Sequence, residues 1–123
     1  MRLIALVFAF VIAVAPDGEA KIKVIATTTD LAAIAAAVGE DRIDVGSLAP
    51  AGGDPHHVEA KPSMIRKVHD ADLLLAVGAE LEIGWLPAIL ESARNPRVLP
   101  GRPGYLDLSK SVVILEKPSG SEK

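Results

Sequence analysis

Short strand-like segments alternate with helix-like segments along most of this chain, and this alternation is what most constrains its fold. The strand candidates are brief and rich in β-branched or aliphatic residues, and 72–77 is a continuous apolar run, as expected of a strand covered on both faces. The helix candidates carry apolar residues at spacings of three and four. The order β-α-β-α-β-α-β predicts an α/β fold in which helices flank a parallel sheet, because parallel neighbours need crossover connections.

The predicted elements begin and end at residues that suit such positions. A helix with Thr29 or Asp30 as its N-cap is expected to stop at Gly39. Ser63 is expected to cap a short second helix, and Pro87 suits the first turn of a third. The apolar faces of these helices are predicted to hold Leu31, Ile34, Ala35 and Val38 in the first, Ile65 and Val68 in the second, and Leu86, Ile89, Leu90 and Ala93 in the third. The predicted strands are 21–26, 42–48, 72–77, 97–99 and 112–115.

The N-terminus has the pattern of an export signal. Arg2 gives a positive start, and an uninterrupted apolar run follows from Leu3 to Val14, too short for a membrane span of about 20 residues. We favour cleavage after Ala20 over an earlier cut that would leave Pro16 next to it. The alternative is a buried N-terminal helix or strand, but the run shows no helical face. Residues 1–20 are therefore predicted to be a signal peptide and 21–123 an exported, soluble domain without a lipid-anchor cysteine, which is periplasmic, or secreted in a cell with only one membrane.

Composition excludes several classes of function. The length of 123 residues fits one small domain. The formal net charge is −3 and no basic block is present, so a nucleic-acid partner is not expected. The chain has no cysteine, which excludes a disulfide scaffold, thiolate metal ligands and a thiol nucleophile. No phosphate-binding glycine loop and no Gly-x-Ser-x-Gly motif is present, and no organic cofactor is expected.

One loop, rich in glycine and proline, carries the residues best suited to chemistry. It covers 49–62 and follows the second strand, so it lies where ligands gather in parallel sheets, at the carboxyl edge. His56 and His57 are the candidate metal ligands, since a neutral imidazole nitrogen suits zinc and other late first-row ions. Pro55 stiffens the chain before His56, and Asp54 can orient the His56 ring through its other nitrogen. Neighbouring side chains in an extended chain point to opposite sides, so the two histidines are not expected to bind the same ion, and one of them is expected to face solvent or a neighbour.

Simpler interpretations remain for each of these residues. His56 and His57 can both be surface-loop histidines, and Glu59 can be a loop carboxylate that faces water. His69 is interpreted as a solvated helix residue. The three threonines 27–29 can bind an anion through backbone N–H groups, but helix capping explains them more simply.

The order of motifs from 21 to 117 resembles that of the zinc- and manganese-binding solute-binding proteins of ABC importers. In that family an export signal, a strand and a threonine-rich helix start precede an Asp-Pro-His loop. One subgroup also shares the later motifs. Each motif is short, but their joint order is specific. The matching segments are Ala26 to Asp30, Asp54-Pro55-His56, Lys61-Pro62-Ser63, Ala71-Asp72-Leu73, Glu82 to Pro87, Arg94-Asn95-Pro96 and Pro100 to Asp107.

The resemblance implies a role and an architecture. It implies that His56 is the first metal ligand and that the protein captures zinc or manganese and delivers it to a membrane permease. Family members have two α/β lobes with the ion between them, and a second histidine in an Asn-Pro-His motif. Residues 21–123 therefore correspond to an incomplete first lobe, in a truncated chain without the second. Val58 and Ala60 depart from the tyrosine and proline that are commonest in the family, which leaves the choice between zinc and manganese open.

Two other classes of function are weighed against this one. A metal hydrolase needs an open coordination position and a nearby general base, and the sequence shows no such set, so we expect no enzyme. An exported domain with a structural or adhesive role needs no metal at all. We expect a monomer that binds metal weakly, because a zinc site needs about four ligands and only His56 is identified here.

Overall fold

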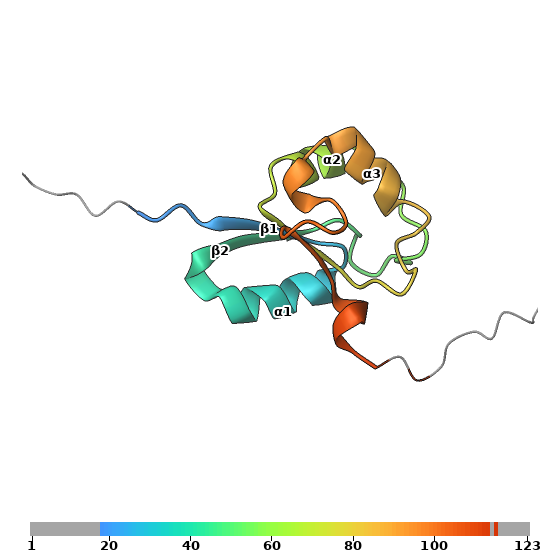
Figure 1. Ribbon diagram of the computed structural model, residues 1–123, viewed down its shortest axis with the longest axis horizontal. Coiled ribbons are helices and arrows are strands. Elements are labelled where there is room, and N and C mark those ends of the chain that lie inside the picture. The colour runs from blue at the N-terminus through green and yellow to red at the C-terminus, as the bar shows by residue number, and fades with distance from the viewer. Residues whose placement is uncertain (1–17, 114, 116–123) are drawn as a thin grey trace, which may run out of the picture.

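The computed structural model describes residues 18–113 and 115 and shows a four-stranded parallel sheet between two layers of helices (Figure 1). The order of strands in the sheet is β2-β1-β3-β4. Every neighbouring pair is parallel, with Ile22 opposite Ile43 and Val24 opposite Leu73. The predicted α/β fold with a parallel sheet is confirmed.

The elements follow one another in a regular alternation. The strands are β1 (Ile22–Ala26), β2 (Ile43–Ser47), β3 (Leu73–Ala76) and β4 (Tyr105–Asp107). The α-helices are α1 (Thr29–Gly39), α2 (Pro62–His69) and α3 (Leu86–Ala93). Three short 3₁₀ helices complete the set: η1 (Glu40–Arg42), η2 (Pro96–Val98) and η3 (Leu108–Ser111).

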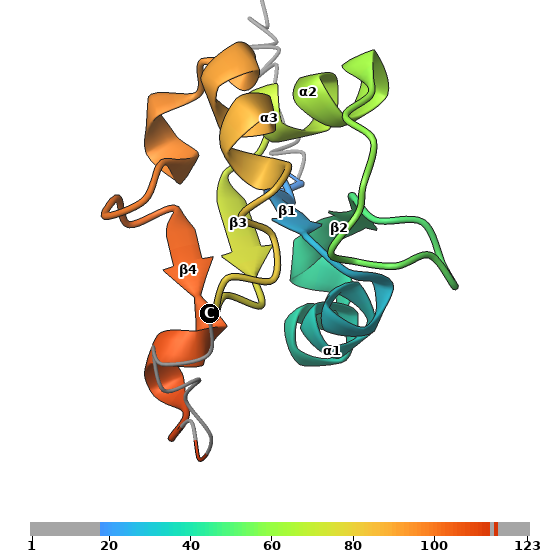
Figure 2. The ribbon, with the colours of Figure 1, turned by 90° about the vertical axis from the view of Figure 1, so that its right-hand side faces the viewer.

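Alternate strand residues build two separate apolar layers. Ile25 and Leu74 point to the side of α2 and α3, where the larger core cluster forms around Ile89 and Val68. Their chain neighbours, including Leu75, point to α1. Figure 2 shows the sheet from its edge, with α2 and α3 over one face and α1 under the other. This two-sided burial explains why β3 is a continuous apolar run.

The face on the α1 side is only partly covered. Helix α1 packs on β1 and β2, and an apolar groove of about 380 Å³ runs beside it over β3 and η3. Leu31 is buried, but Ile34 is 61% exposed and Val38 81% exposed. The predicted apolar face of this helix therefore exists, and its four residues all line the open groove.

Several element boundaries differ from the predictions. Helix α1 is capped by Thr28, whose side chain accepts from the Leu31 N–H, because Thr29 is already helical. Helix α2 begins at Pro62 rather than after a Ser63 cap, since proline suits the first helical position.

The last two predicted strands are wrong within the described residues. The segment predicted as a strand at 97–99 forms η2, because Pro96 starts a turn that Asn95 caps through the Arg97 N–H at 3.1 Å. The final strand is β4, at residues for which no strand was predicted. Val112 and Val113 are not in a strand, and residue 114 lies outside the described residues.

The predicted signal peptide lies mostly outside the described residues, which start at Gly18. Among the residues that the structure describes, no helix has the length and apolar character required to cross a bilayer.

Candidate metal centre

The loop that carries the histidines starts as a continuation of the sheet. After β2, the Leu48 and Ala49 amides donate to the Ala26 and Thr27 carbonyls at 2.9 Å each. The loop therefore leaves the carboxyl edge in line with β1 and then turns outward through residues 50–61. The predicted position of the loop, at the carboxyl edge of the sheet, is confirmed.

Asp54 organises both histidines. One oxygen of its carboxylate lies 3.0 Å from His56 Nδ1 and accepts from the His56 backbone N–H at 2.9 Å. The other oxygen lies 2.8 Å from His57 Nδ1. Hydrogen bonds from His57 and His56 hold the pKa of the Asp54 carboxyl well below its usual range. An anionic partner at Nδ1 leaves Nε2 of each ring as the nitrogen with a free lone pair.

This geometry bears on two predictions. The predicted contact between Asp54 and the ring of His56 is confirmed. The prediction that His56 and His57 diverge to opposite sides is wrong, because both rings turn back to one carboxylate and their centroids are 6.5 Å apart. A tight turn, closed by the His57 N–H on the Asp54 carbonyl at 3.1 Å, replaces the extended chain assumed for them.

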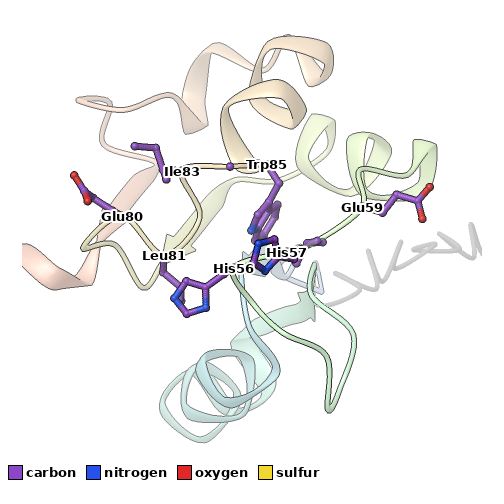
Figure 3. Close-up of a pocket in the computed structure, with 9 residues that line it drawn as sticks. His56, His57, Glu59, Glu80, Leu81, Ile83 and Trp85 are labelled. Atoms are coloured by element: carbon purple, nitrogen blue, oxygen red, sulfur yellow. The ribbon is translucent and has the colours of Figure 1, made fainter. Parts of the chain in front are cut away.

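A hollow of about 540 Å³ lies beside the histidines, between this loop and the segment that precedes α3 (Figure 3). Glu59 and Glu80 line its rim, but their carboxylates point away from the rings. In the part of the chain that the structure describes, no three histidine or carboxylate side chains are placed to share an ion. His56 and His57 therefore present nitrogens to an open space rather than to a finished coordination shell.

The remaining candidates fit the simpler interpretations. His69 is exposed, and its Nδ1 lies 2.9 Å from the Ala93 carbonyl at the end of α3. Glu59 is exposed, in agreement with its interpretation as a solvated carboxylate. Thr28 caps α1, which favours capping over anion binding at the threonines.

Two buried residues near the site were not singled out by sequence reasoning. Glu82 is 4% exposed and accepts from the Thr27 hydroxyl at 2.6 Å. Trp85 is also 4% exposed, and its Nε1–H donates to the Pro55 carbonyl at 2.9 Å. The only sequence signal for them was their place in a segment that resembles one subgroup of the importer proteins.

This chain resembles substrate-binding proteins of metal transporters and a family of zinc-uptake proteins. The profile of the family described as "Zinc-uptake complex component A periplasmic" (ZnuA) matches residues 24–122. The manganese ABC transporter substrate-binding lipoprotein PsaA of Streptococcus mitis is 32% identical over 106 residues, which cover 84% of this chain and 33% of that protein. The iron ABC transporter substrate-binding lipoprotein MtsA of Streptococcus pyogenes is 30% identical over the same length.

A solved structure supports the fold. The metal-dependent lipoprotein YcdH from Bacillus subtilis superposes with a TM-score of 0.61 at 26% identity, over 78% of this chain and 34% of that one. The chain spans about a third of the length of the curated relatives that it matches. The relatives are binding proteins of transporters rather than enzymes. The chain therefore belongs to the ZnuA family of metal-binding solute-binding proteins of ABC importers.

Proposed function

We propose that this chain captures a divalent metal ion through Nε2 of His56 and serves as the N-terminal lobe of an importer's binding protein. The observation that supports this most directly is the hydrogen bond that the Asp54 carboxylate accepts from His56 Nδ1, at 3.0 Å. A carboxylate behind a histidine fixes the ring, selects the tautomer and raises the basicity of the free nitrogen. The side chain of His56 is 63% exposed, so an ion can reach it.

The cargo is a first-row divalent ion of the zinc and manganese class. Imidazole suits such ions, whereas magnesium and calcium prefer oxygen ligands. The relatives are named for manganese and for iron, and the family for zinc, so His56 alone does not choose between them. In our proposal the other ligands come from residues beyond those that the structure describes.

The proposal extends to location and partner. Residues 1–20 act as a leader, residues 21–123 work as a monomer in the periplasm, and the loaded protein delivers its ion to an ABC permease. Support comes from the apolar run in 3–14 and from relatives named as substrate-binding lipoproteins of ABC transporters.

Calorimetric titration of the chain with Zn²⁺ and with Mn²⁺ tests the central step. We expect weak binding, and we expect His56→Ala to reduce the affinity at least about tenfold. Mutating a residue that only hydrogen-bonds to a metal ligand lowers metal affinity roughly 10- to 100-fold, so removing the ligand itself should cost no less. His69→Ala is the matched control, since it removes an exposed histidine at the far end of α2. Binding that His56→Ala leaves unchanged would contradict the proposal, and His57→Ala reports whether the second ring contributes.

A further inference from the structure

Trp85 joins two segments that are far apart in the sequence. It lies immediately before α3, where the Trp85 and Leu86 amides donate to the Glu82 carbonyl at 3.2 and 3.0 Å. Its indole is buried, and the Nε1–H reaches the carbonyl of Pro55, the residue that precedes His56. In Figure 3 the Trp85 side chain extends from the segment before α3 toward the histidine loop.

The segment that carries Trp85 is itself held firmly on the sheet. The Glu82 carboxylate accepts from the Val77 N–H at 2.8 Å and from the Gly78 N–H at 3.1 Å, just past the end of β3. It also accepts from Thr27 at the end of β1. Glu82 therefore fixes this segment to the carboxyl ends of two central strands, and Trp85 is three residues further along the same turn.

The histidine loop has few other attachments. Most hydrogen bonds of residues 50–60 are internal to the loop, such as those between the Asp54 carboxylate and the two histidine rings. Among the described residues, the Trp85–Pro55 bond is the one hydrogen bond from 50–60 to another part of the chain. Val58 adds an apolar contact with the larger core cluster. An exposed loop with a single polar anchor depends on that anchor for its order.

We propose that Trp85 is a positioning residue for the metal ligand His56, through the hydrogen bond of its indole N–H to the Pro55 carbonyl. The inference rests on the proposed function, in which His56 binds the ion. With the bond in place, the loop holds His56 in its binding geometry before an ion arrives. Without it, the ion must order the loop as it binds, and affinity falls.

The sharpest test removes only the N–H. Trp85 is the sole tryptophan of the chain, so benzothienylalanine can replace it site-specifically and leave the ring shape unchanged. We expect affinity for Zn²⁺ and for Mn²⁺ to fall by about threefold to tenfold, the range of one ordinary hydrogen bond. Ile89→Val is the matched control, because it trims a fully buried side chain of α3 that cannot bond to the loop. We expect it to leave metal affinity unchanged.

A second readout needs no metal. Backbone ¹⁵N relaxation of the metal-free protein should show lower order at the His56 and His57 amides in the benzothienyl variant than in the wild type, with unchanged order in β1 and β3. Unchanged backbone order at His56 in the benzothienyl variant would overturn the inference. Unchanged metal affinity of that variant would overturn it as well, provided that His56→Ala weakens binding. If His56→Ala leaves metal affinity as it is, the proposed function fails, and the relaxation result still decides the role of Trp85.

Discussion

Replacing Asn95 by alanine should lower the free energy of unfolding by about 3 kcal/mol. The Asn95 side chain is 4% exposed, and its Nδ2 donates to the Val68, His69 and Ala71 carbonyls at 2.8–2.9 Å. These carbonyls end α2 and lead into β3, and two of the bonds are buried. The Val68 carbonyl still accepts from the Ala71 N–H, but alanine removes the side-chain donor from the His69 and Ala71 carbonyls, and a buried unpaired polar group costs about 1–3 kcal/mol. Denaturant unfolding of the two proteins measures the difference.

Two variants separate this cause from others. Asn95→Asp keeps the size and the acceptor for the Arg97 N–H but has no donor for the carbonyls, so we expect it to be at least as destabilising. Arg97→Ala removes the exposed ion pair with Asp72 at 2.8 Å and should cost less than about 1 kcal/mol. An Asn95→Asp protein as stable as the wild type would show that packing, not donation, is what matters here.

Gly78→Ala should also cost about 3 kcal/mol. Gly78 has φ +82°, a left-handed conformation that costs other residues roughly 1–2 kcal/mol. A β-carbon here would also overlap Asp107 Oδ1 and lie 2.5 Å from the Ser109 hydroxyl. Asp107 caps η3 through the Ser109 amide at 3.1 Å, so the clash displaces a cap worth about 1 kcal/mol as well. Thermal unfolding of the variant should show the loss as a lower Tm.

The neighbouring residue gives the control. Ala79 is exposed and also left-handed, with φ +51°. Ala79→Gly relieves that strain but raises the entropy of the unfolded chain, so stability should change by less than about 1 kcal/mol. The structure indicates that Asp107 leaves no room for a β-carbon at Gly78. A stability loss for Gly78→Ala as small as that for Ala79→Gly would contradict this.

The sequence could predict those helices and strands whose formation depends on residues close together in the chain. Strands β1, β2 and β3 have periodicity or continuous burial that a short window contains, and they lie within two residues of their predicted bounds. Helix α3 likewise contains all four residues of its predicted apolar face. Strand β4 has no such signal: it is three residues long and exists because Tyr105 and Leu106 pair with β3. It forms a strand because it pairs with β3, about thirty residues earlier in the chain, and a pattern within a short window of sequence cannot reveal that pairing.

The site shows the same division. The Asp-Pro-His loop and its place at the carboxyl edge follow from residue types and from β-α alternation, and the resemblance added His56 as the ligand. The links of Trp85 to Pro55 and of Glu82 to Thr27 join residues 30 and 55 positions apart. No spacing rule connects such pairs, so only the three-dimensional structure shows these two hydrogen bonds.

The anchored loop has a kinetic consequence. Its start continues along β1 through Leu48 and Ala49, and its middle is bonded to Trp85, so in the proposed function little of it must rearrange when an ion arrives. Association is slow where binding requires a conformational change and fast where it does not. The rate of capture would then be set by how quickly the ion sheds water. Mg²⁺ dehydrates reluctantly, so a rigid His56 would exclude this abundant ion during brief encounters as well as at equilibrium.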